Sequence, residues 1–213
     1  MYSVKKLNSI SNVIYDYLPK DRYNISSELD AYEAIIVRSA DCHEIEFPES
    51  LLAIARAGAG VNNIPLDKSS DLGIAVFNTP GANANGVKEL VLCGMLAASR
   101  NVIPAIEWAK TLKGSGADVP KLVEKGKSQF VGPELKGKSL GVVGLGAIGI
   151  LVANTAAAIG MEVIGYDPFL SVDRAWSISM HTRRANDLEE LLIQSDYVTL
   201  HIPLMDQQKD FNS

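Results

Sequence analysis

The sequence is poor in the residues that build disulfide frameworks, metal sites and nucleic-acid-binding surfaces. Its 213 residues include two cysteines, Cys42 and Cys93, which lie far apart and form no C-x-x-C pair. We expect both to stay thiols, with Cys93 in the core. The three histidines show no metal-ligand spacing, which argues against a metal site. A net charge of −5 without a basic run argues against a nucleic-acid partner.

Long apolar runs are also missing. No stretch free of charged and polar residues is long enough to span a bilayer, which argues against a membrane partner. Residues 1–11 carry two lysines but no apolar core of signal-peptide length follows, so we expect a cytoplasmic protein. The composition, 47% hydrophobic and 21% charged, is that of an ordinary globular protein with one large domain or two small ones.

The most informative stretch, residues 139–167, follows the order of a dinucleotide-binding βαβ unit. An apolar strand runs into a G-x-G-x-x-G turn and an Ala-rich helical segment, and a second apolar strand ends at Asp167. Gly144 permits the tight turn. Gly146 lets the backbone approach a pyrophosphate at the helix N-terminus, and Gly149 lets helix and strand pack closely.

The acid at the end of this stretch indicates which dinucleotide is bound. Asp167 lies eighteen residues after Gly149, where a carboxylate can accept hydrogen bonds from the adenosine ribose hydroxyls. It would repel a 2′-phosphate, and Pro168 and Phe169 offer no cation to receive one. The sequence therefore predicts NAD in preference to NADP. The alternative, a nucleotide-free βαβ unit with a glycine-rich turn, is disfavoured by the complete order of strand, turn, helix, strand and acid.

The rest of the chain has the pattern of an α/β protein. Short strands and helices are expected to alternate over residues 1–92, and each of three strands ends in a polar or glycine-rich turn, where parallel sheets bind ligands. A long helix is expected at 86–110, interrupted or kinked at Pro104. A polar surface excursion is expected to follow. The other expected elements are strands at 33–37, 51–57, 74–77 and 196–202, the excursion at 113–137 and a helix at 186–194.

Five segments, in order, resemble the D-isomer-specific 2-hydroxyacid dehydrogenases. They are VRSAD at 37–41, RAGAGVNNI at 56–64, FNTPGANANGVKELV at 77–91, ELKGKSLGVVGLGAIG at 134–149 and SDYVTLHIPL at 195–204. The resemblance implies an NAD-dependent oxidoreductase that oxidises 3-phospho-D-glycerate, or a similar D-2-hydroxy acid, in serine biosynthesis. It also implies two parallel-sheet domains: a flavodoxin-like substrate domain over 1–92 and an incomplete Rossmann NAD-binding domain over 93–213. The first long helix of the NAD domain would form a homodimer or a higher homo-oligomer.

The resemblance also implies which residues bind. Arg38 and Ser39 would contact anionic groups of the substrate, the amides of Ala59, Gly60 and Val61 would cradle its carboxylate, and Asn83 would contact it. The implied cofactor-binding residues are Gly144, Gly146, Ala147, Ile148, Gly149, Tyr166, Asp167, Pro168, His201, Ile202 and Pro203. Each also has a purely structural interpretation: a strand-end arginine, turn glycines, a turn-forming asparagine and a structural histidine.

The family's catalytic groups have no counterpart here. The Arg that orients the substrate, the Glu and the general acid/base His all belong to motifs that would follow His201, so no catalytic residue is assigned. We therefore expect the sequence to be a fragment or an incomplete copy of a longer enzyme, inactive by itself. The alternative is a non-catalytic NAD-binding protein of the same fold, similar to the related corepressors.

Overall fold

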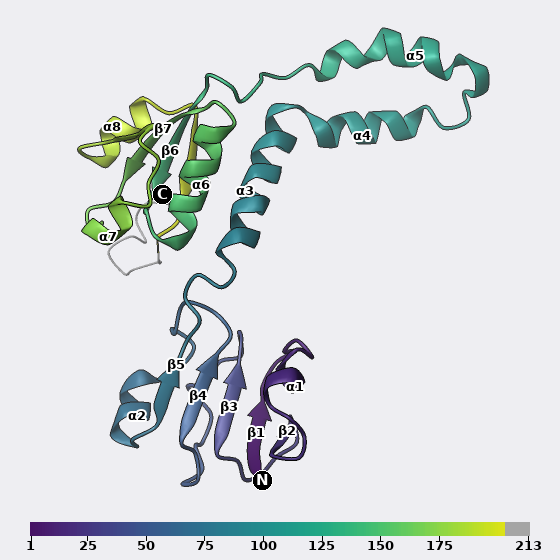
Figure 1. The fold of residues 1–213 in the computed structure, drawn as a ribbon. Helices are drawn as coiled ribbons and strands as arrows, with labels where there is room; N and C mark the ends of the chain where they lie inside the picture. Colours follow the sequence, from purple (N-terminus) through teal and green to yellow (C-terminus); the bar gives the residue numbers. More distant parts are fainter. Residues whose placement is uncertain (203–213) are drawn as a thin grey trace. The chain divides into compact units, whose positions relative to one another are not determined.

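The computed structural model describes residues 1–202, which fall into two compact units (Figure 1). The units are Met1–Asn83 and Ala84–Ser213. The boundary therefore lies nine residues before the predicted 92/93. The reason is that the helix from Ala84 to Ser99 packs Val91 and Met95 onto the core of the second unit.

The first unit is a five-stranded parallel sheet with the strand order β2-β1-β3-β4-β5. This is the 2-1-3-4-5 order of flavodoxin-like folds, as expected. Ile35, Val37 and Ile54 are fully buried at its centre, and β-branched residues favour the extended conformation there. The elements are β1 (Tyr2–Lys6), α1 (Ile14–Tyr17), β2 (Tyr23–Ser26), β3 (Ala34–Val37), β4 (Ala53–Arg56), α2 (Leu66–Asp71) and β5 (Ala75–Phe77).

The second unit contains a four-stranded parallel sheet with the order β8-β7-β6-β9. Counted from its own first strand this is 3-2-1-4, the first four strands of the Rossmann order. The elements are α3 (Ala84–Ser99), α4 (Val102–Thr111), η1 (Gly116–Asp118), α5 (Val119–Gly126), η2 (Lys127–Phe130), β6 (Ser139–Val143), α6 (Ala147–Ala158), β7 (Glu162–Tyr166), α7 (Val172–Ala175), β8 (Thr182–Arg184), α8 (Leu188–Ile193) and β9 (Tyr197–Leu200).

The predicted helix over 86–110 is two helices, and the break is not at Pro104. Asn101 adopts a left-handed conformation with φ 50°, and this residue separates α3 from α4. Pro104 is the third residue of α4, in the first turn, where a backbone N–H has no helical acceptor and a proline costs little. Within residues 1–202, no single helix is long and apolar enough to cross a membrane. The two helices meet that criterion only as a pair, which is bent by 59°.

One further expectation for this region is wrong, and another gains detail. The polar surface excursion at 113–137 contains α5 and two short 3₁₀ helices. Trp108 of α4 packs against Phe130, with ring centroids 5.2 Å apart, and a Cβ at Gly126 would lie 2.2 Å from the Trp108 ring. Cys93 is exposed and not in the core, because α3 turns Val91 and Met95 inward instead.

Candidate functional site

The turn between β6 and α6 places a glycine where no other residue fits. Gly144 has φ 87°, in the left-handed region, and its N–H donates to the carbonyl of Tyr166 at the end of β7 (2.8 Å). A Cβ at this position would lie 2.7 Å from the His201 carbonyl oxygen and from Ile202 Cγ2. The turn therefore contacts the ends of both neighbouring strands, β7 and β9.

The other two glycines of the motif differ from each other. A Cβ at Gly149 would lie 1.9 Å from the carbonyl oxygen of Gly144, so this glycine allows α6 to pack directly on the turn. A Cβ at Gly146 would meet no atom of residues 1–202 within 4 Å. Gly146 is the N-cap of α6, which starts with Ala147 and Ile148. Within the part of the chain that the structure describes, no side chain caps the first turn of this helix. Its backbone N–H groups are thus available to an anionic ligand.

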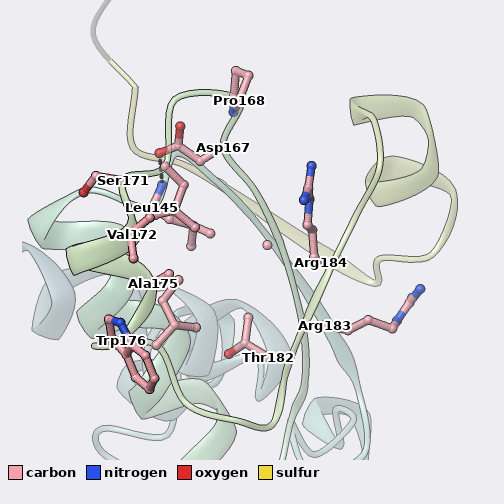
Figure 2. Close-up of a pocket in the computed structure, with 13 residues that line it drawn as sticks. Leu145, Asp167, Pro168, Ser171, Val172, Ala175, Trp176, Thr182, Arg183 and Arg184 are labelled. Atoms are coloured by element: carbon pink, nitrogen blue, oxygen red, sulfur yellow. Dashed lines mark hydrogen bonds between the residues drawn. The ribbon is translucent and has the colours of Figure 1, made fainter.

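Asp167 holds this turn in place with both carboxylate oxygens. Oδ2 accepts a hydrogen bond from the Leu145 N–H at 2.8 Å (Figure 2). Oδ1 accepts one from the Phe169 N–H, also at 2.8 Å. A carboxylate oxygen has a second acceptor site, so both oxygens can still accept a hydrogen bond from a ligand hydroxyl. The acid therefore has a structural function, and this function is compatible with the predicted contact to a ribose.

Strand β9 brings His201 and Ile202 to the same end of the sheet. The His201 N–H donates to the Val143 carbonyl (2.8 Å), and its Nε2 lies 3.0 Å from Thr199 Oγ1. Half-burial lowers the pKa of the His201 imidazole, which favours the neutral ring. Pro203, also expected here, lies outside the described residues.

A cavity of about 610 Å³ opens beside Asp167 and contains a residue that the sequence reasoning missed (Figure 2). Arg184, at the end of β8, lines it together with Asp167 and Pro168. Strand pairing, which the sequence does not display, brings Arg184 there. The full lining is Leu145, Gly165, Asp167, Pro168, Leu170, Ser171, Val172, Ala175, Trp176, Ile178, Thr182, Arg183 and Arg184.

In the first unit, the loop after β3 carries Arg38 and Ser39, both exposed. Asn8, which follows β1, fixes this loop: its Oδ1 accepts hydrogen bonds from the N–H groups of Arg38, Ser39 and Ala40, at 3.0, 3.0 and 2.9 Å. Asn8 was not predicted as part of any site. Its contribution depends on pairing between strands whose loops are about thirty residues apart in the sequence.

The loop after β4 is held by its carbonyl groups. Asn78 Nδ2 donates to the Ala59 carbonyl (2.7 Å), and an Arg56 guanidinium nitrogen donates to the Gly60 carbonyl. By contrast, the N–H groups of Ala59, Gly60 and Val61 find no acceptor among residues 1–202. Arg56 and Asn78 were not predicted to act here.

The remaining predicted substrate residue is placed less specifically. Asn83 is exposed and is the last residue of the first unit. The loops after β3 and β4 lie at the same edge of the sheet, because both follow neighbouring parallel strands. The structure therefore brings together Arg38, Ser39 and the 59–61 loop in one unit, and the residues of the glycine turn, Asp167 and His201 in the other.

Residues 92–212 match the family described as D-isomer specific 2-hydroxyacid dehydrogenase, NAD binding domain. The chain belongs to this family. The matched region is more than half of the chain and includes β6, α6, β7 and β9, so the cofactor of this domain is NAD. The uncapped first turn of α6 and the open space at Gly146 fit the pyrophosphate of that cofactor.

Curated relatives of the chain include D-3-phosphoglycerate dehydrogenases. The protein from Archaeoglobus fulgidus is 36% identical over 208 residues, which cover 91% of this chain and 37% of the relative. The protein from Methanocaldococcus jannaschii is 41% identical over 160 residues, which cover 75% of this chain and 28% of the relative. The chain thus spans about a third of the length of these relatives.

Solved structures show the same fold. The NAD⁺-bound 3-phosphoglycerate dehydrogenase of Entamoeba histolytica is 26% identical with a TM-score of 0.69, covering 98% of this chain and 65% of that one. The TT0316 protein of Thermus thermophilus has a TM-score of 0.78 at 23% identity, covering 99% of this chain and 68% of that one. The second likeness supports the fold alone.

Proposed function

We propose that the chain forms part of an NAD-dependent dehydrogenase that oxidises 3-phospho-D-glycerate, or a similar D-2-hydroxy acid, towards serine. The observation that carries this proposal is the glycine turn of 144–149. Asp167 ties this turn to the end of β7, and the turn contacts His201, which follows β9. The names of the curated relatives support the choice of 3-phospho-D-glycerate.

On the cofactor side, each group has a separate proposed task. The first-turn N–H groups of α6, from Ala147 and Ile148, receive the pyrophosphate, and Asp167 accepts the ribose hydroxyls. Tyr166, Pro168, His201, Ile202 and Pro203 complete the proposed cofactor contacts. When bound, NAD supplies the acceptor for the hydride that leaves substrate C2. A neutral His201 adds no charge beside the dinucleotide.

On the substrate side, the proposed site is an anion site. The three N–H groups of the 59–61 loop have no acceptor among residues 1–202 and can bind a carboxylate, while Arg38 offers a cation one strand away. Ser39 and Asn83 complete the proposed substrate contacts. Arg56 and Asn78 act as positioning residues, because they hold the loop by its carbonyls and leave its N–H groups free.

The test is NADH formation from 3-phospho-D-glycerate by the full-length protein. D-lactate serves as the comparison substrate, since it carries the carboxylate but no phosphate. We expect Arg38→Gln to raise the KM for the phosphorylated substrate, while NADH affinity stays unchanged. NADH binding without oxidation of any D-2-hydroxy acid would contradict the proposed dehydrogenase activity. It would still agree with the assignment of the second unit as an NAD-binding domain. An unchanged KM in Arg38→Gln would contradict the role of Arg38.

We also propose that the protein is a homo-oligomer, formed across α3 and α4. The face of α3 that does not pack on the core carries Leu90 and Leu96, which are 72% and 47% exposed. Ile103 and Ile106 of α4 are 63% and 50% exposed. Helix faces this apolar are usually covered, and a two-fold dimer would cover them. A cytoplasmic location stays a prediction from the N-terminal sequence.

A further inference from the structure

Arg184 lines the cavity beside Asp167 because of the way in which β8 pairs with β7. The parallel register places Arg184 opposite Gly165, and the N–H of the next residue, Ala185, donates to the Gly165 carbonyl at 2.9 Å. Asp167 follows Gly165 by two residues, so it lies about 7 Å further along the strand direction. Gly165 has no side chain to separate Arg184 from the cavity, and Arg184 and Asp167 both line it.

The two neighbouring arginines of β8 are not equivalent. Both line the cavity, but the Arg183 guanidinium donates to Glu190 Oε1 at 3.1 Å and also contacts Gln194. Arg184 points to the opposite face, because successive strand residues alternate. Among residues 1–202, its guanidinium has no hydrogen-bond or ion-pair partner, so its charge is uncommitted.

Arg184 is not neutralised by the acid in the same cavity. No ion pair joins it to Asp167 within the described part of the chain. Instead, both Asp167 oxygens accept backbone N–H groups, from Leu145 and Phe169, which fix the carboxylate at the turn. The cavity thus holds one anchored negative charge and one free positive charge.

We propose that Arg184 is a receptor for a 2′-phosphate and that the negative charge of Asp167 opposes phosphate binding there. The inference rests on the assignment of the adenosine ribose to Asp167. A guanidinium binds phosphate with two parallel hydrogen bonds, whereas a carboxylate repels it. The expectation that no cation is available for a 2′-phosphate, drawn from Pro168 and Phe169, therefore overlooks a residue that strand pairing supplies. The preference for NAD depends on the balance of these two charges.

The test compares 5′-AMP with 2′,5′-ADP, which differ only by the 2′-phosphate, in calorimetric titrations of the whole chain. We expect Asp167→Asn to raise the affinity for 2′,5′-ADP relative to 5′-AMP by about tenfold, the effect of gaining one charge-assisted contact. Adding Arg184→Gln should abolish the gain. Adding Arg183→Gln, which removes a guanidinium that is already bonded to Glu190 and Gln194, should preserve it.

Asp167→Asn also removes an acceptor for one backbone N–H, so a second variant keeps Asp167. Arg184→Gln alone should weaken 2′,5′-ADP binding about tenfold and leave 5′-AMP binding unchanged. The proposal is overturned if Arg184→Gln and Arg183→Gln have the same effect, or if Asp167→Asn produces no gain while remaining folded by thermal melting. If the native chain binds NADH but Arg184→Gln does not change the affinity for 2′,5′-ADP, the proposal for Arg184 fails and the assignment of NAD stands. If it binds neither NADH nor 5′-AMP, the cofactor assignment fails as well.

Discussion

Two glycines of the turn, Gly146 and Gly149, allow the effects of packing and of ligand binding to be separated by experiment. Gly149→Ala places a methyl group 1.9 Å from the Gly144 carbonyl oxygen, whereas Gly146→Ala places one where no atom of the described residues 1–202 lies within 4 Å. The two substitutions are chemically identical and lie in the same turn. We predict that the first destabilises the second unit and that the second leaves its stability nearly unchanged but weakens NADH binding.

The magnitudes follow from the two environments. Ordinary van der Waals contact begins near 3.4 Å, so Gly149→Ala requires α6 and the turn to separate by about 1.5 Å. The opposing atom belongs to the backbone and cannot rotate away, so the cost should reach about 3 kcal/mol, the upper end of the overpacking range. For Gly146→Ala, the weaker N-cap preference of alanine is offset by the lower entropy of the unfolded chain, and the net change should stay within about 0.5 kcal/mol.

The assays are urea unfolding followed by circular dichroism and NADH titration followed by fluorescence. In Gly149→Ala, binding should be lost in proportion to folding. In Gly146→Ala, the fold should persist while the dissociation constant rises about tenfold, because the methyl group occupies the space of the pyrophosphate. Equal destabilisation by both substitutions would refute the packing argument. Unchanged NADH affinity in Gly146→Ala would refute the pyrophosphate position.

Three further predictions concern pH, assembly and turnover. Burial lowers the pKa of His201 in the folded state, so the unfolded chain binds its proton more readily and the free energy of unfolding should fall as the pH drops below about 6.5. The assay is urea unfolding at pH values between about 5 and 8, in which the midpoint of the native protein should fall towards low pH. In His201→Gln, the part of this fall that comes from His201 should be missing. Leu90→Glu should convert a dimer into a monomer by light scattering at micromolar concentration, and a native monomer would contradict the proposed interface. Residues 1–213 alone should form no NADH from 3-phospho-D-glycerate, because general acid/base catalysis is worth about a hundred- to ten-thousandfold and no group here is assigned to it; turnover that disappears in His201→Ala would contradict this.

The sequence predicted best what is encoded locally. The positive φ at Gly144 and the close packing at Gly149 arise within a few residues of each motif position, and the structure confirms both. The order of strand, turn, helix and strand was also predicted correctly, since each element has its own apolar pattern. By contrast, β1 and α7 were not predicted, because β1 contains two lysines and α7 is a single turn.

The residues that the sequence reasoning missed reach their sites through long-range pairing. Asn8 binds a loop about thirty residues away, and Arg184 enters the cavity through its register with Gly165. A strand register cannot be read from composition or periodicity. Likewise, α5 could not be predicted from its polar sequence. Trp108 of α4 packs against Phe130 of η2, and this contact between the elements before and after α5 cannot be read from the α5 sequence.

The C-terminal ends of the two sheets differ in charge in a way that matches two different ligands. The first unit offers the free N–H groups of 59–61 and the guanidinium of Arg38, which are donors and a cation, and so favours an anion. The second unit offers the N-terminus of α6 and, within the same turn, the carboxylate of Asp167. A dinucleotide needs both features of the second unit, the N–H groups at the helix N-terminus and the carboxylate, because its pyrophosphate is negative and its ribose hydroxyls are donors. The net charge of −5 predicts neither preference, because each depends on where a few groups stand at the strand ends.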